Sequence, residues 1–159
     1  MDSLKTDFLR EVSSCQAMLH QVCNVYSEGK GEKEDLFHEV LYQLWKSYPS
    51  FERKSKFSTW LYRVALNTAI IYYGKNRKLS EHELHVEDFP DPNEDRREED
   101  QRIDEMYKAI NKLGKIDKAI ILLFLEDKKY EEIAEILGMT TSNVGVRLLR
   151  ARKKLETMI

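Results

Sequence analysis

Residues 130–154 contain the pattern that most restricts what this chain can fold into. Ile133 and Ala134 lie on the apolar face of a short amphipathic helix. Gly138 follows at the point where a helix end favours a left-handed residue. Because Ala134 is small enough for two helices to cross closely, Val144 can pack back from a second helix. This spacing predicts a helix-turn-helix, a motif whose second helix enters the major groove of DNA.

The second helix of this motif is basic. Between Gly138 and Leu155 the chain has five basic residues and no acidic one. Such a surface neutralises phosphates and releases counterions, and Thr140 or Thr141 can cap the helix that carries it. The alternative is an ordinary helical hairpin with a solvated basic face. Because spacing and charge agree, we favour DNA binding over that alternative.

Charge is distributed unevenly along the chain. Residues 81–105 contain twelve acidic side chains and three arginines, a local charge of −9. Since the whole chain carries −2, the remaining residues carry +7. Pro90 and Pro92 prevent a continuous helix in the acidic segment, which we expect to be extended or disordered when free. The predicted organisation is a basic domain at 1–80, an acidic linker at 81–99 and a basic domain at 100–159.

Helical periodicity recurs along the chain, and no segment alternates with a period of two for long enough to indicate a sheet. Gly29 and Gly31 break the first helix, and Pro49 stops the second. The predicted fold class is therefore all-α, with a three-helix N-terminal domain and a four-helix C-terminal domain. The expected helices cover residues 3–26, 32–47, 58–76, 100–113 and 117–125, followed by the two helices of the helix-turn-helix.

Composition indicates a globular protein. Hydrophobic residues make up 42% of the chain, and no apolar run approaches the length of a membrane span. The N-terminus lacks an apolar signal core, so we expect a cytoplasmic protein. On one helix Cys15 and Cys23 would lie roughly 12 Å apart, which is too far for a disulfide. We therefore expect both cysteines to be free thiols.

One helix and the loop before it combine aromatic and cationic side chains. Trp60, Arg63 and Asn67 recur on one stripe of the helix that starts near Ser58. Aromatic rings stack on unpaired bases, arginine pairs with phosphate, and amides read base edges. The preceding loop, 51–57, places three basic residues between two aromatic ones, which suits a pocket for an extruded base. The alternative is that Trp60 belongs to the core, as a tryptophan on an amphipathic helix more often does.

Three segments carry a resemblance to a known family. They are DLFHEVLYQLWKSYPSF at 35–51, KFSTWLYRVALNTAI at 56–70 and the helix-turn-helix at 130–154. In this order and spacing they resemble bacterial sigma factors of the extracytoplasmic-function (ECF) group of the sigma-70 family. That group keeps two helical domains, known as regions two and four. The resemblance covers most of the chain, and it allows the two motifs to support each other.

The resemblance implies a transcription initiation factor that binds core RNA polymerase and directs it to promoter DNA. In similar proteins the helix matching 35–45 docks on the polymerase clamp, and the loop matching 51–57 captures a flipped base of the melted −10 element. The C-terminal helix reads the −35 element as duplex, and the helices around it engage the polymerase flap. The acidic linker resembles those threaded toward the RNA path, and its charge suggests that it also screens the basic surfaces.

The resemblance assigns the candidate residues to three surfaces. The predicted polymerase-binding residues are Asp35, Glu39, Gln43 and Trp45. The predicted −10 residues are Phe51, Arg53, Lys54, Lys56, Phe57, Trp60, Arg63, Asn67, Lys75 and Arg77. The predicted −35 residues are Thr140, Thr141, Ser142, Asn143, Val146, Arg147, Arg150 and Lys154.

Some positions depart from the family pattern. Gly74 and Gly145 stand where similar proteins often carry a basic residue, in the −10-binding helix and the recognition helix. For this reason the promoter sequence does not follow from relatives. Lys129 replaces the usual Ser or Thr cap before the helix at 130–137, which costs about 1 kcal/mol of local helix stability.

The sequence contains no recognisable catalytic or metal-binding motif. Asp35, His38 and Glu39 share a helical face, but HExxH would need a second histidine at the position of Tyr42. There is no glycine-rich phosphate loop and no GxSxG motif. We expect no metal, no cofactor, no small-molecule substrate, no membrane insertion and no enzymatic activity.

Two other classes of protein are alternatives. A two-component or quorum-type regulator could use the same helix-turn-helix, but it needs a receiver or ligand domain, usually with strands. A helical adaptor that binds protein and not DNA is disfavoured by the basic recognition helix. An anti-sigma factor is a further candidate partner.

Overall fold

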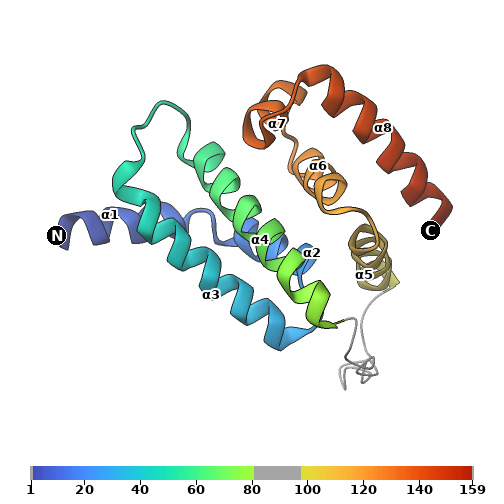
Figure 1. Cartoon of the computed structure of the whole chain (residues 1–159), viewed down its shortest axis with the longest axis horizontal. Coiled ribbons are helices and arrows are strands. Elements are labelled where there is room, and N and C mark those ends of the chain that lie inside the picture. The colour runs from blue at the N-terminus through green and yellow to red at the C-terminus, as the bar shows by residue number, and fades with distance from the viewer. Residues whose placement is uncertain (1, 81–97, 159) are drawn as a thin grey trace.

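The computed structural model describes residues 2–80 and 98–158, apart from the side chains of residues 2, 73–80, 99 and 100. Every regular element in the described ranges is helical (Figure 1), which confirms the all-α class. Residues 81–97, nearly all of the predicted linker, lie outside the described residues. The screening role predicted for the linker depends on these residues and stays a prediction. The elements are α1 (Asp2–Ser13), α2 (Gln16–Tyr26), α3 (Lys30–Ser47), the 3-10 helix η1 (Tyr48–Ser50), α4 (Phe57–Ser80), α5 (Glu98–Asn111), α6 (Lys115–Leu125), α7 (Tyr130–Leu137) and α8 (Thr141–Met158).

The single helix expected at 3–26 is instead two helices, α1 and α2. The break begins at Ser14, whose hydroxyl donates to the carbonyl of Glu11 at 2.7 Å. Just before it, the Ser13 hydroxyl donates to the carbonyl of Leu9 at 2.6 Å. Serine hydroxyls that bond to backbone carbonyls compete with the helical ladder and bend helices. The prediction of three N-terminal helices is therefore wrong, because residues 2–80 form four α-helices.

The paired helices α3 and α4 bury the apolar residues that the sequence places at helical spacing. Leu36 and Val40 of α3 are fully buried, as are Leu61 and Ala65 of α4. Their packing explains why both expected helices form, although each extends beyond its predicted bounds. The two helices run side by side in Figure 1, and the loop at 51–56 joins their ends.

The helix-turn-helix forms as predicted. Gly138 ends α7 in the left-handed conformation, with φ of 66°. The hydroxyl of Thr140 accepts a hydrogen bond from the backbone N–H of Asn143 at 3.1 Å, which identifies the capping threonine of α8. Val144 is fully buried and holds α8 against the preceding helices. Lys129 occupies the N-cap position of α7 and makes no side-chain capping bond there.

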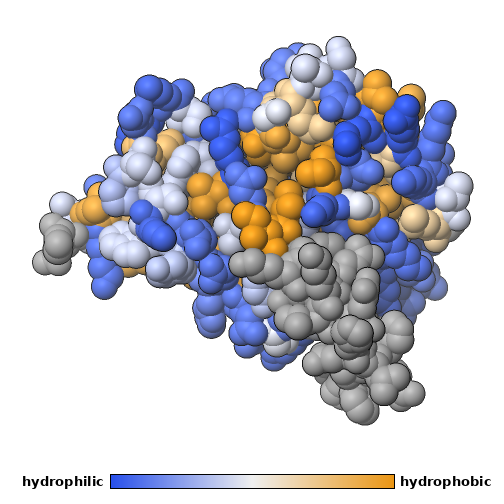
Figure 2. Space-filling view, in the orientation of Figure 1, coloured by the Kyte–Doolittle hydropathy of each residue, from blue (hydrophilic) through white to orange (hydrophobic). Residues whose placement is uncertain are grey.

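The N-terminal and C-terminal helices pack directly against each other. Helices α2 and α4 contact α5, α6 and α7, and the buried residues of both halves form one hydrophobic core. The Tyr26 hydroxyl donates to the carbonyl of Lys115 across this contact. Lys118 of α6 is fully buried, and its ammonium donates to the carbonyl of Val25 at 3.1 Å. Figure 2 shows hydrophobic residues gathered where α4 faces α6 and α7, with hydrophilic residues on either side.

Candidate nucleic-acid interface

Aromatic rings cluster where the loop at 51–56 meets α4. The ring centroid of Trp60 lies 4.9 Å from that of Phe51 and 5.5 Å from that of Phe57. Tyr48 of η1 is buried beneath them, 6.4 Å from Phe57. The rings of Phe51, Phe57 and Trp60 are half-buried. Trp60 therefore packs on the core and still keeps part of its surface accessible.

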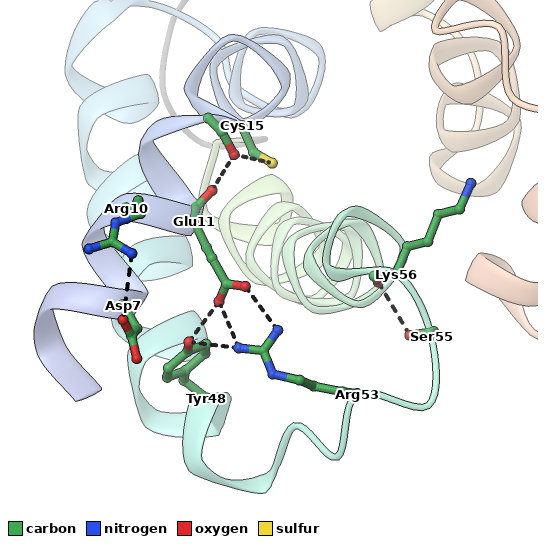
Figure 3. A network of polar contacts seen from close by, with 9 residues as sticks. Asp7, Arg10, Glu11, Cys15, Tyr48, Arg53, Ser55 and Lys56 are labelled. Atoms are coloured by element: carbon green, nitrogen blue, oxygen red, sulfur yellow. Dashed lines mark hydrogen bonds and ion pairs between the residues drawn. The ribbon is translucent and has the colours of Figure 1, made fainter. Parts of the chain in front are cut away.

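Arg53 points back from this loop toward α1 (Figure 3). Its Nη1 lies 3.0 Å from Glu11 Oε1, and its Nη2 lies 3.4 Å from Glu11 Oε2. The Tyr48 hydroxyl donates to the same carboxylate at 2.6 Å. Partial desolvation acts to raise the pKa of Glu11, but the hydrogen bonds from Arg53 and Tyr48 outweigh it and lower that pKa. Glu11 is therefore ionised and shared between the loop and η1.

The two lysines of the loop are exposed. Lys54 forms an ion pair of 2.9 Å with Glu52, whose side chain is also exposed. Such pairs add little free energy in water, so Lys54 can exchange its partner for a phosphate. Lys56 extends away from the Glu11 network in Figure 3.

Beyond Trp60, the stripe predicted along α4 is exposed at Arg63 and Asn67, and Arg63 is already engaged. The Arg63 guanidinium donates from Nη2 to the carbonyl of Glu135 in α7 at 2.7 Å. Asn67 lines a groove of about 610 Å³ between α3 and α4, together with Glu39 and Gln43. Two other residues of α4 were predicted for this surface, Lys75 and Arg77. Their side chains lie outside the described part of the chain.

The residues predicted to bind polymerase fall into two places. Asp35, Glu39 and Gln43 follow one face of α3, and the Gln43 amide donates to Glu39 Oε1 at 3.1 Å. Trp45 turns toward α1, where its ring centroid lies 5.0 Å from that of Phe8. It remains 40% exposed. The structure thus separates Trp45 from the other three residues.

Most residues predicted to face duplex DNA are exposed on α8, which lies on the outer side of the molecule, away from α1 to α4 (Figure 1). Val146 is 48% exposed, and Arg150 is also exposed. Arg147 turns toward α6, where its Nη1 lies 3.4 Å from Asp117 Oδ1. The other exposed members of the predicted set are Thr140, Thr141, Ser142, Asn143 and Lys154.

Glu11 and Tyr48 belong to this surface, although neither was predicted from the sequence. Glu11 lies 42 residues before Arg53, and no local pattern pairs residues at such a distance. The only hint was an aromatic residue, Tyr48, next to Pro49 and close to the predicted loop. The contact depends on how α1 packs against η1, and periodicity alone does not predict that packing.

The described residues contain no group of three or more His, Cys, Asp or Glu side chains that could hold a metal ion. None of the helices in the described ranges is long and apolar enough to cross a membrane.

The fold and these surfaces define a helical DNA-binding protein of transcription, and two family models match it. "Sigma-70 region 2" matches residues 12–79, and "Sigma-70, region 4" matches residues 103–155. The ECF RNA polymerase sigma-E factor of Haemophilus influenzae is 33% identical over 79% of this chain and 73% of its own length. The RNA polymerase sigma factor SigV of Bacillus subtilis is 27% identical over 84% of this chain and 80% of its own.

Solved structures agree on the fold. CnrH in complex with the cytosolic domain of CnrY matches with a TM-score of 0.70 and 19% identity, over 97% of this chain and 88% of that one. The sigma factor RpoE of Bartonella quintana, in complex with the anti-sigma factor NepR, matches with a TM-score of 0.70 and 22% identity, over 96% of both chains.

The chain belongs to the ECF group of sigma factors, within the sigma-70 family. It is a non-enzymatic transcription initiation factor that binds core RNA polymerase and promoter DNA. Region 2 directs the polymerase to the −10 element, and region 4 directs it to the −35 element. Membership of this family decides against the two-component regulator and the protein-only adaptor.

Proposed function

We propose that loop 51–57 and the exposed face of α4 hold the melted −10 strand. The observation that carries this proposal is the cluster of half-buried rings beside two exposed lysines, Lys54 and Lys56. Extruding a base costs a few kcal/mol, and stacking on an aromatic ring offsets a similar amount. The other residues proposed for this surface are Phe51, Arg53, Phe57, Trp60, Arg63, Asn67, Lys75 and Arg77.

The exposed face of α8 is proposed to read the −35 element as duplex. It combines the basic side chains of Arg150 and Lys154 with Ser142 and Asn143 near the start of the helix. Helix-turn-helix proteins place this end of the recognition helix against base edges. Arg147 joins the surface once it exchanges Asp117 for a phosphate or a base.

The face of α3 that carries Asp35, Glu39 and Gln43 is proposed to contact core polymerase. Trp45 adds an exposed ring on another side of α3, toward α1. We assign the region 2 domain to 1–80, the linker to 81–99 and the region 4 domain to 100–159.

Since polymerase and chromosome share the cytoplasm of bacteria, we propose that this protein acts in the cytoplasm. Both solved neighbours are complexes with a second protein, which makes an anti-sigma factor a candidate partner of this chain.

The packed arrangement restricts when the −10 surface can act. Because Arg63 donates to the carbonyl of Glu135, its guanidinium is engaged by α7. We propose that α4 and α7 separate when the protein joins the polymerase, so that Arg63 becomes available to DNA. The exposed face of α8 needs no such change.

The proposal is tested by in vitro transcription with core polymerase and a library of genomic fragments, which also identifies a promoter. On that promoter, Trp60→Ala should abolish the permanganate reactivity of the melted −10 region while polymerase binding is retained. Lys54→Ala with Lys56→Ala should weaken the same complex in a salt-dependent way. Lys5→Ala, an exposed lysine on α1, is the control and should change neither property.

Normal promoter melting by Trp60→Ala would contradict the proposal. A simultaneous loss of polymerase binding and melting would show that Trp60 is structural, and the stacking role would then be abandoned.

A further inference from the structure

The backbone of loop 51–57 adopts a conformation that requires support. Arg53 has φ of 58°, in the left-handed region that non-glycine residues seldom adopt. No glycine lies in this loop to make such a turn easy. The Arg53 side chain makes hydrogen bonds to Glu11 and Tyr48 that can stabilise this turn.

Glu11 supplies those contacts and reaches the aromatic cluster at the same time. It receives two hydrogen bonds from the Arg53 guanidinium, at 3.0 and 3.4 Å, and one from the Tyr48 hydroxyl at 2.6 Å. The Tyr48 ring in turn lies 6.2 Å from that of Trp60 and 6.4 Å from that of Phe57. The Glu11 carboxylate thus connects the turn at Arg53 to Tyr48, which lies beneath the aromatic cluster. Figure 3 shows Glu11 between Tyr48 and Arg53.

The helix that carries Glu11 is itself anchored to the fold. Phe8 is buried, with its ring 5.0 Å from Trp45 and 5.1 Å from Tyr48. Val12 is buried one position after Glu11. The region 2 match begins at residue 12, so Glu11 lies outside it, whereas Tyr48 and Arg53 lie inside. The support for the loop therefore comes from a helix that is mostly additional to the matched region.

We propose that Glu11 is a positioning residue, which holds loop 51–57 in the shape that receives an extruded base. This inference rests on the function proposed above for that loop. Arg53 then acts through the turn, with its charge already paired, and the lysines Lys54 and Lys56 supply the phosphate contacts. A preformed loop spends less of its binding energy on ordering when the base enters.

Loss of the Glu11–Arg53 ion pair should have effects that differ from those of a general loss of stability. Replacing Glu11 by Gln loosens the turn and also frees the positive charge of Arg53. Capture of the extruded base should become weaker, because the loop is less ordered. Non-specific binding of single-stranded DNA should become stronger, because one more cation is available. The two readouts should therefore move in opposite directions.

The test uses holoenzyme assembled from core polymerase and the full-length chain. The probe is a promoter fragment selected by the wild-type holoenzyme, with 2-aminopurine placed in turn at each non-template position of its −10 region. Glu11→Gln should lower the fluorescence increase that reports base extrusion by about tenfold. Its binding to oligothymidylate should show a salt dependence about one unit steeper than wild type.

Matched variants test whether Glu11 acts through Arg53. Asp7→Asn removes a carboxylate from the same helix that forms an ion pair of 4.0 Å with Arg10, and it should behave as wild type. Arg53→Gln should also weaken extrusion. The double variant Glu11→Gln, Arg53→Gln should be no worse than Arg53→Gln alone, because the two residues act as a pair.

Several results would overturn the inference. Wild-type extrusion and salt dependence in Glu11→Gln would do so, as would equal losses in Glu11→Gln and Asp7→Asn. Additive losses in the double variant would show that Glu11 and Arg53 act separately. If Trp60→Ala still abolishes extrusion in these cases, the proposed function of the loop stands and only the role of Glu11 fails. Normal extrusion in Trp60→Ala would instead reject the function itself.

Discussion

Lys118 combines a fully buried position with a charged side chain. Burying an ammonium is costly unless it is fully hydrogen-bonded. Here the Nζ atom lies 3.1 Å from the carbonyl of Val25, 3.0 Å from Asn111 Oδ1 and 5.4 Å from the centre of the Tyr26 ring. Val25 and Tyr26 belong to α2, whereas Lys118 belongs to α6. One side chain therefore joins the N-terminal and C-terminal helices.

Lys118→Ala should lower the free energy of unfolding by about 3 kcal/mol, because it leaves a cavity and unpaired acceptors. Lys118→Met keeps the length of the side chain and should cost less, about 1 to 2 kcal/mol. Urea denaturation of the two variants measures the difference. An unfolding free energy within 0.5 kcal/mol of wild type for Lys118→Ala would contradict this role, since about that much is ordinary for surface positions.

Cys23 should make stability depend on alkaline pH. Desolvation by burial raises the pKa of its thiol from 9.0 to about 11. Between these values the unfolded chain releases a proton that the folded protein retains, so stability falls as pH rises. For a shift of this size the fall is at most about 2 to 3 kcal/mol. Burial also raises the pKa of Tyr62, which adds a decline of the same sign.

The share of Cys23 is isolated by Cys23→Ala. This variant should have a shallower decline of unfolding free energy between pH 9 and 11 than wild type, as measured by urea denaturation across that range. Identical slopes would mean that the Cys23 thiol titrates alike in both states.

At the scale of elements, the N-terminal ends of α7 and α8 differ in capping. Thr140 caps α8 through its hydroxyl, whereas Lys129 precedes α7 with extended backbone angles, φ −72° and ψ 157°, and no capping bond. These angles suit a serine cap. Lys129→Ser should therefore raise the unfolding free energy by about 0.5 to 1 kcal/mol, and Thr140→Ala should lower it by about 1 kcal/mol. Thermal denaturation tests both signs, and a stabilising Thr140→Ala would contradict the assigned cap.

Helix α8 should contribute to duplex binding through a definite side chain. Arg150 is exposed on its outer face and carries a full positive charge. Arg150→Ala in holoenzyme should weaken binding to promoter DNA that contains the −35 element and reduce the salt slope by about one unit. Arg102→Ala, an exposed arginine on α5, is the matched control. Equal affinity and equal salt slope for Arg150→Ala and wild type would remove Arg150 from the DNA surface.

The helices could largely be predicted because their causes are local. Apolar spacing identified α3 and α4, and Gly138 with Thr140 marked the turn between α7 and α8. The first helix was predicted wrongly. Its apolar pattern continues across Ser13 and Ser14, where both hydroxyls bond to backbone carbonyls and the helix breaks after Ser13. Side-chain competition of this kind leaves no trace in periodicity.

At the scale of the whole molecule, the contact of α2 and α4 with the C-terminal helices holds the protein in a closed arrangement. We expect this contact to open on binding core polymerase. Energy transfer between dyes at Gln16→Cys and Lys153→Cys should fall when polymerase is added. Both native cysteines are buried, so labelling is selective.

Dyes at Arg102→Cys and Lys153→Cys, both within the C-terminal helices, should show no change and serve as the control. Unchanged transfer for the first pair in an active holoenzyme would show that the closed arrangement persists.

The sequence by itself determined the helical class and the helix-turn-helix, because both depend on short-range spacing of apolar, small and basic residues, and its resemblance to sigma factors indicated the family. It also identified the aromatic and basic character of loop 51–57. Only the tertiary structure decided that Glu11 holds Arg53, that Lys118 joins α2 to α6 and that α7 engages Arg63. These contacts join residues 42 to 93 positions apart. They form because packing of the helices buries apolar surface, and only that packing brings these polar groups within hydrogen-bonding distance.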